Sequence, residues 1–202
     1  MEREELYFQP EIECAEPEVL REIQSERLHS MVARCYQHVP FYRRKLDEMG
    51  IRPEDIQSID DIVKLPFTYK TDLRDHFPYG LVAVPKEEVV RVRACSGRPG
   101  KQPGVAYAQH DIDVWANGAA RALAAAGCTR SDYVHISYGY GLFTGGLGLH
   151  YGAEKLGAAA IPVSSGNTKR QVQILQDFGS NFLCCTPSYA AYIGETCREM
   201  GV

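Results

Sequence analysis

The chain has 202 residues, of which 45% are hydrophobic and 24% charged, and its formal net charge is −4. These values are typical of a soluble globular protein with room for one large domain or two small ones. No stretch approaches the roughly 18 consecutive apolar residues of a membrane span, so we expect no membrane partner. A mildly acidic balance argues against nucleic acid as a partner, because phosphate binding needs clustered Lys and Arg. The charged start, Met1 to Glu5, precedes no apolar run, so we expect no secretory signal.

The cysteines and histidines indicate a reducing compartment and no metal site. The seven cysteines are an odd number, and no two have the spacing of a zinc or redox motif. Cys184 and Cys185 are adjacent within an apolar segment, as expected of small buried hydrophobic residues. The six histidines are scattered without metal-ligand spacing. We therefore expect a cytoplasmic protein without a bound structural metal.

Residues 1–80 are predicted to form a helical N-terminal segment. Apolar residues recur at helical spacing over 18–35, and Pro40 separates this helix from a shorter one over 41–49. Further helix start signals lie at Ser58, which has Asp61 three residues on as in a capping box, and at Thr71.

Residues 81–202 are predicted to form an α/β subdomain. Short β-branched or apolar runs predict strands at 82–84, 89–92, 133–137, 158–163 and 181–185. Helices are predicted from a cap at Asp111 to an end at Gly127, through 153–156, from a cap at Asn167 to Phe178, and from Pro187 onward. Strands that alternate with helices at this spacing indicate βαβ units in a parallel sheet.

The first segment that could carry chemistry is the loop 95–101. It contains Ser96, Gly97, Gly100 and Lys101 after a predicted strand. Glycines allow the backbone to approach phosphate oxygens closely, and amides and a lysine meet their charge. The spacing is not that of a Walker loop, and a glycine turn with an exposed lysine is an equally good interpretation.

The second segment, 138–146, joins a strand to a helix. Its aromatic residues among glycines suit a flat apolar ligand, and open α/β sheets bind ligands at this kind of position. A tightly turned loop with buried aromatic residues is the alternative, and composition alone favours it. The segments 164–167 and 186–189 occupy equivalent places after later strands, where a cap serving only its own helix is the common case.

Taken together, these segments resemble the N-terminal region of phenylacetate–CoA ligases, members of the adenylate-forming (ANL) superfamily. The resemblance spans nearly the whole chain. It rests on the sets Pro40-Phe41-Tyr42, Leu65-Pro66-Phe67-Thr68, Lys70, Asp72-Leu73-Arg74, Pro78, Gly80, Ser96-Gly97, Gly100-Lys101, Asp111-Ile112-Asp113, Tyr138 to Gly146, His150 to Glu154, Ile161-Pro162-Val163, Gly166-Asn167-Thr168, Gln171 and Thr186-Pro187-Ser188-Tyr189.

The resemblance implies an acyl-CoA synthetase-like fold and a place in phenylacetate catabolism. Such enzymes join an arylacetate carboxylate to ATP in the presence of Mg²⁺, and coenzyme A then displaces AMP. By resemblance, the loop with Ser96, Gly97, Arg98, Gly100 and Lys101 handles the ATP phosphates. Tyr138, Tyr140, Phe143 and Gly145 would lie in or beside the pocket for a small aromatic carboxylate.

Two departures from the family pattern matter. The family's phosphate loop usually reads Ser-Ser-Gly-Thr-Thr-Gly-Lys-Pro, whereas Cys95, Arg98 and Pro99 replace its first serine and two threonines here. Because Pro99 lacks an N–H and both threonine hydroxyls are lost, we expect weaker ATP binding than is usual in the family. The family's adenine motif, ribose-binding aspartate and catalytic lysine lie C-terminal to all the matched segments, so no catalytic residue is assigned.

We therefore expect the N-terminal part of an aryl-acid CoA ligase that is inactive by itself. The alternatives are an aryl-acid-binding or regulatory module that has lost phosphate chemistry, and one half of a split enzyme completed by a separate C-terminal chain. A homodimer is also compatible with the sequence.

Overall fold

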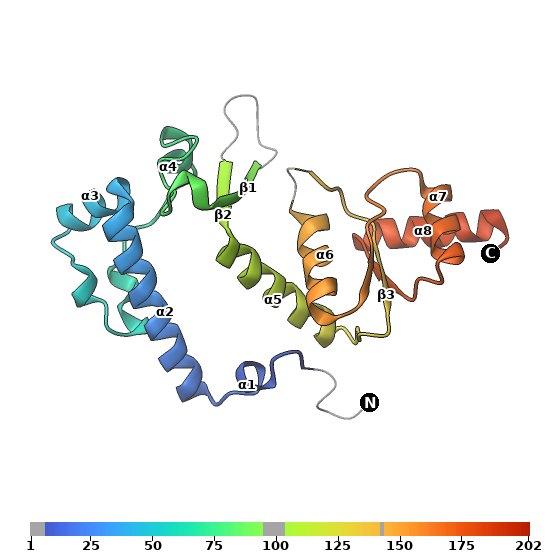
Figure 1. Ribbon diagram of the computed structural model, residues 1–202, viewed down its shortest axis with the longest axis horizontal. Helices are drawn as coiled ribbons and strands as arrows, with labels where there is room; N and C mark the ends of the chain where they lie inside the picture. The colour runs from blue at the N-terminus through green and yellow to red at the C-terminus, as the bar shows by residue number, and fades with distance from the viewer. Residues whose placement is uncertain (1–6, 95–103, 142–143) are drawn as a thin grey trace. The chain divides into compact units, whose positions relative to one another are not determined.

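The computed structural model describes residues 7–94, 104–141 and 144–202 (Figure 1). Compactness divides the chain into a unit of residues 11–109 and a unit of residues 110–202 with the N-terminal residues up to Pro10. The predicted domains, 1–80 and 81–202, follow instead the change from helical to mixed composition, and that division stays a prediction.

Helices dominate the unit of residues 11–109. The short α1 (Pro10–Glu13), which the sequence did not predict, precedes α2 (Pro17–His38) and α3 (Pro40–Glu48). Val39 separates α2 from α3 with an extended backbone (φ −115°, ψ 102°), because a residue before proline avoids the helical region. Shorter elements follow: η2 (Pro53–Asp55), η3 (Ile59–Lys64), α4 (Lys70–Asp75) and η4 (Lys86–Glu88).

This unit has its own small apolar core. Val32 of α2, Leu46 of α3 and Ile56 after η2 are buried against one another. Leu28, Tyr36, Ile51 and Leu65 pack around them. Burial of these side chains stabilises α3 and η2, which at 9 and 3 residues are too short to be stable by themselves.

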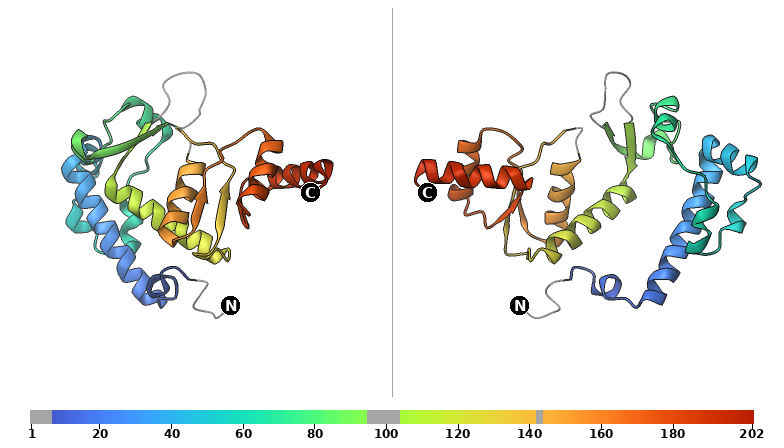
Figure 2. Two further views of the ribbon diagram at one scale, coloured as in Figure 1. Left: turned by 45° about the vertical axis from the view of Figure 1, so that its right-hand side comes forward. Right: turned by 180° about the vertical axis from the view of Figure 1, so that it is seen from behind.

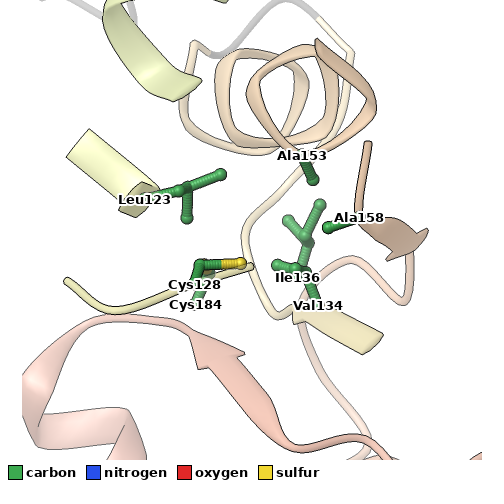
Figure 3. Packing of buried hydrophobic residues seen from close by; sticks show 7 residues of the cluster. All are labelled: Leu123, Cys128, Val134, Ile136, Ala153, Ala158 and Cys184. Carbon is green, nitrogen blue, oxygen red and sulfur yellow. The ribbon is translucent and has the colours of Figure 1, made fainter. Parts of the chain in front are cut away.

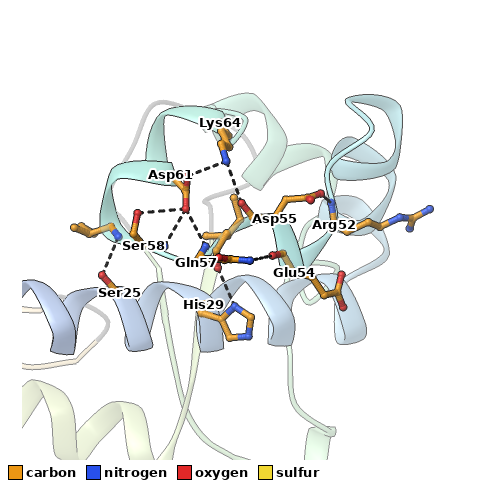
Figure 4. A network of polar contacts seen from close by, with 11 residues as sticks. Ser25, His29, Arg52, Glu54, Asp55, Gln57, Ser58, Asp61 and Lys64 are labelled. Atoms are coloured by element: carbon orange, nitrogen blue, oxygen red, sulfur yellow. Dashed lines mark hydrogen bonds and ion pairs between the residues drawn. The ribbon is translucent and has the colours of Figure 1, made fainter.

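A polar network fixes the irregular chain beside α2 (Figure 4). The Asp61 carboxylate accepts the backbone N–H groups of Ser58 and Gln57, each at 2.9 Å, and pairs with Lys64 at 2.8 Å. These contacts hold the pKa of Asp61 well below its usual range. The capping box predicted at Ser58 is thus confirmed. The start predicted at Thr71 is displaced, because α4 begins at Lys70.

Strands β1 (Val89–Ala94) and β2 (Gly104–Ala108) form an antiparallel pair. The strand predicted at 82–84 is wrong. Val82 closes a turn by donating its N–H to the carbonyl of Tyr79 at 3.0 Å, and Pro85 follows three residues later. A β-branched run without a partner strand makes no ladder, so residue type alone is misleading there.

The unit of residues 110–202 contains the predicted parallel sheet. Its strands β3 (Tyr133–Ile136), β4 (Ala159–Ile161) and β5 (Phe182–Cys184) lie in the order β4-β3-β5, all parallel. They alternate with the helices α5 (Gln109–Ala125), α6 (Gly145–Leu156), α7 (Thr168–Asp177) and α8 (Pro187–Met200). The predicted α/β class with a helical N-terminal part and βαβ units is confirmed.

Two helix starts differ from those predicted. Helix α5 begins at Gln109, so Asp111 lies in its first turn, where a carboxylate still favours the helix dipole. Helix α6 begins at Gly145, within a run predicted to be loop. Glycine has a low helix propensity, but Gly148 and Gly152 of α6 pack closely against Trp115 and Ala119 of α5, where a Cβ would clash, and this packing overrides propensity.

Helices cover both faces of this sheet, with α6 on one side and α7 and α8 on the other (Figures 1 and 2). Val134 and Ile136 of β3 belong to an apolar cluster with Ala153 of α6, whereas His135 between them contacts α7. Figure 3 shows this cluster of Leu123, Cys128, Val134, Ile136, Ala153, Ala158 and Cys184. One face of β3 is therefore purely apolar, and the other carries a buried polar contact.

Candidate functional site at the carboxyl edge of the sheet

The loops that follow β3, β4 and β5 emerge at one edge of the sheet, because the three strands are parallel. They surround an open hollow of about 430 Å³. Its lining comes from all three loops and from α8: Ser137, Tyr138, Gly139, Ser165, Gly166, Thr186, Ser188, Tyr189 and Tyr192. Three tyrosine rings and small residues at the carboxyl edge of a parallel sheet are well suited to a flat organic ligand.

The predicted aryl-pocket residues occupy different surroundings. Tyr138 lines the hollow. Tyr140 instead packs against the apolar cluster, and its hydroxyl lies 3.5 Å from Nδ1 of His150, whose Nε2 lies 3.1 Å from Glu154. Burial raises the pKa of Tyr140 to about 12. Gly145 is the first residue of α6, outside the residues that line the hollow.

The loop between β4 and α7 has an unusual backbone. Ser164 (φ 71°), Gly166 (φ 90°) and Asn167 (φ 43°) all adopt positive φ angles. Only glycine adopts this region without steric cost, so Ser164 is strained. The side chain of Asn167 accepts the N–H of Arg170 at 3.2 Å, which confirms the cap predicted there.

A single buried side chain connects this loop to β3. Gln171 of α7 is 1% exposed, and its Nε2 donates to the carbonyl oxygens of Ser164 at 2.8 Å and Gly166 at 3.2 Å. Its Oε1 lies 2.7 Å from Nε2 of His135 and accepts the hydroxyl proton of Ser137 at 2.8 Å. The amide thus uses both donors and two acceptor positions.

These partners determine the tautomer of His135. Because carbonyl oxygens can only accept, the NH₂ of Gln171 faces Ser164 and Gly166, and its oxygen faces His135. His135 therefore carries its proton on Nε2. Its Nδ1 is buried and has no hydrogen-bond partner among the described residues. Burial lowers the pKa of His135, partly offset by the bond to Gln171.

Sequence reasoning missed the central place of Gln171 and the contribution of Tyr192 to the hollow. In the sequence, Gln171 is distinguished only by the family resemblance. No local signal singles it out, because Gln171 and Gln173 both flank the buried Val172 and only Gln171 is buried with it. A buried polar side chain at such a position needs partners, but only the fold identifies them.

Ser96, Gly97, Arg98, Gly100, Lys101 and Phe143 lie outside the described residues. Across the described ranges, no group of three His, Cys, Asp or Glu side chains could hold a metal ion. Within those same ranges, no helix is long and apolar enough to cross a bilayer.

Comparison with characterised proteins points to one enzyme family. The chain is 53% identical over 197 residues to a phenylacetate-coenzyme A ligase of Thermus thermophilus, covering 98% of this chain and 44% of that protein. It is 49% identical over 191 residues to the phenylacetate-coenzyme A ligase of Escherichia coli, covering 94% and 44%. No family model matches the chain.

Solved structures agree with the sequence comparison. A 2-hydroxyisobutyryl-CoA ligase in complex with 2-HIB-AMP and CoA superposes with a TM-score of 0.91 at 30% identity, over 100% of this chain and 44% of that chain. The same ligase in its postadenylation state, with 2-HIB-AMP, gives a TM-score of 0.89 at 31% identity. The chain therefore spans less than half the length of the proteins it matches.

Proposed function

Because this chain belongs to the phenylacetate–CoA ligase family and corresponds to the N-terminal portion of its members, we propose that it forms the acid-binding and phosphate-binding part of an aryl-acid CoA ligase. In the reaction, a carboxylate oxygen attacks the α-phosphorus of ATP and pyrophosphate leaves. The thiolate sulfur of coenzyme A then attacks the acyl carbon, and AMP leaves. The first step converts a poor electrophile into one with a good leaving group.

The observation that carries this proposal is 53% identity to a phenylacetate-coenzyme A ligase over nearly the whole chain. The hollow at the carboxyl edge of the sheet supports it. Tyr138, Tyr189 and Tyr192 place aromatic side chains in the lining, where they can contact an aromatic acid, and Gly139 and Gly166 leave room for it. We assign the aryl group to this hollow.

The ATP phosphates are assigned to the loop with Ser96, Gly97, Arg98, Gly100 and Lys101, on the strength of the resemblance. Mg²⁺ would accompany the nucleotide, but the described residues offer no group of ligands for it, so no ligand is assigned. Arg98 and Pro99 should weaken ATP binding because they remove two hydroxyl donors and one N–H. Replacing both with Thr should tighten ATP binding in calorimetry, and an unchanged affinity would contradict this reasoning.

A chimera tests the function directly. Residues 1–202 would replace the matching segment of the Thermus thermophilus relative, so that the rest of a ligase is present. With phenylacetate, ATP, Mg²⁺ and coenzyme A, we expect this protein to release pyrophosphate and form phenylacetyl-CoA. The unaltered relative is the positive control, and the 202-residue chain alone should form no product. A folded chimera without activity would refute the proposal.

The second candidate is an aryl-acid-binding module, which Arg98 and Pro99 favour because they alter the phosphate loop. It predicts that phenylacetate binds the 202-residue chain while ATP does not, and that the chimera stays inactive. A split ligase predicts instead that a separate C-terminal polypeptide restores activity. We place the protein in the cytoplasm, and a homodimer would be detected by its mass in light scattering.

A further inference from the structure

We propose that Gln171 is the positioning residue of the aryl-acid hollow, holding the β4–α7 loop and the end of β3 in the arrangement that receives the substrate. This inference rests on the proposed function for the identity of the ligand. The geometry that supports it, a single buried amide bound to two walls of the hollow, is independent of that identity.

The first step concerns what Gln171 touches. Gln171 is not among the residues that line the hollow around Tyr138. Each of its partners in the β4–α7 loop either lines this hollow or is adjacent in sequence to a residue that lines it. Gly166 is itself a lining residue, and Ser164 precedes the lining residue Ser165. On the other side, Ser137 is a lining residue and donates its hydroxyl proton to Gln171.

The second step concerns why the loop needs this support. Ser164 and Asn167 hold positive φ angles without being glycine, and such backbones persist only where surrounding contacts impose them. Strand β4 ends at Ile161, so the sheet ladder stops short of the loop. The backbone bond from Ser164 to the carbonyl of Ile136, at 3.1 Å, anchors one end, and Gln171 supplies two further bonds.

The third step concerns the polarity presented to a ligand. Because the proton of Ser137 is committed to Gln171, the Ser137 oxygen can only accept a hydrogen bond from elsewhere. A substrate carboxylate has no proton to give at neutral pH and is therefore disfavoured at this corner of the hollow. Gln171 thus directs the carboxylate away from Ser137 and leaves this corner to the aryl end.

The test compares Gln171→Met, which removes all four hydrogen bonds at similar volume, with Gln171→Glu, which removes only the two donated to the loop. Gln173→Met is the matched control, an exposed glutamine on the same helix. In the chimera, both Gln171 variants should raise KM for phenylacetate about tenfold or more, with kcat changed much less and KM for ATP unchanged. The control should leave all three constants unchanged.

Hydrogen exchange gives a second readout on the 202-residue chain itself. Amides of residues 163–168 should exchange about tenfold faster in Gln171→Met than in the wild type or in Gln173→Met. Unchanged KM for phenylacetate in an active chimera, or unchanged exchange in this loop, would overturn the proposal. If the wild-type chimera makes no product, the proposed function fails, and the exchange comparison still decides whether Gln171 holds the loop.

Discussion

Gly152→Ala should destabilise the protein, although alanine is the better helix former. Gly152 lies in α6 where this helix approaches α5. A Cβ added there would lie 2.6 Å from Cβ of Ala119, 2.8 Å from its carbonyl carbon and 3.0 Å from N of Ala120. Two of these three atoms belong to the backbone, so the clash is relieved only if the helices move apart.

The net effect follows from two opposed contributions. Overpacking a close contact costs about 1–3 kcal/mol, and a contact with backbone belongs at the upper end of that range. Alanine has a higher helix propensity than glycine, and this difference offsets about 1 kcal/mol of the cost. We therefore expect a loss of about 2 kcal/mol, which lowers Tm by about 4–8 °C in a chain of this size.

Gly118→Ala is the matched control, since Gly118 lies in α5 and a Cβ there would meet nothing within 4 Å. It should stabilise the protein by up to about 1 kcal/mol. Urea denaturation followed by fluorescence of Trp115, the single tryptophan, reports on the same helix pair. A Gly152→Ala midpoint equal to that of Gly118→Ala would refute the close-contact reasoning.

Three further predictions concern the pH dependence of stability, the reactivity of two cysteines and the packing of the core. In the unfolded chain His135 binds a proton near pH 6.5, whereas burial lowers its pKa in the folded protein. The free energy of unfolding should therefore decrease as the pH falls below about 6.5, by at most about 1.4 kcal/mol per pH unit. Urea titrations at several pH values should show a flatter dependence on pH for His135→Gln than for the wild type. Exposed Cys14 should react rapidly with Ellman's reagent, while Cys184, buried with its pKa raised to about 11, should react only on unfolding. Leu46→Ala should cost about 2–5 kcal/mol in denaturation followed by circular dichroism, and the exposed Met49→Ala almost nothing.

Elements with local signals could be predicted from the sequence. The Ser58 capping box, the Asn167 cap and the helix start at Pro187 are each specified within a few residues of chain. The prediction of a strand at 82–84 was wrong for the opposite reason, because a strand forms only where a second strand pairs with it. The start of α6 is missed because helix propensity carries no information about α5, against which Gly148 and Gly152 pack closely.

The candidate site was predictable only in part for the same physical reason. The position of the hollow follows from parallel strands, whose carboxyl ends share one edge. Its internal support does not, because Gln171 is 36 residues from His135 and 34 from Ser137 in the chain. Nothing local in the sequence indicates which of several glutamines on α7 is buried.

The two faces of β3 therefore serve different purposes. Toward α6, Ile136 and Ala153 contribute apolar burial, which is non-directional and sets stability. Toward α7, His135 and Gln171 contribute directional hydrogen bonds, which fix the position of a strained loop at the ligand edge. Because strand β4 contributes only a three-residue ladder, the sheet cannot shape that edge by itself. Substitutions on the α6 face should thus change the free energy of unfolding first, and those at the α7 face should change ligand binding first.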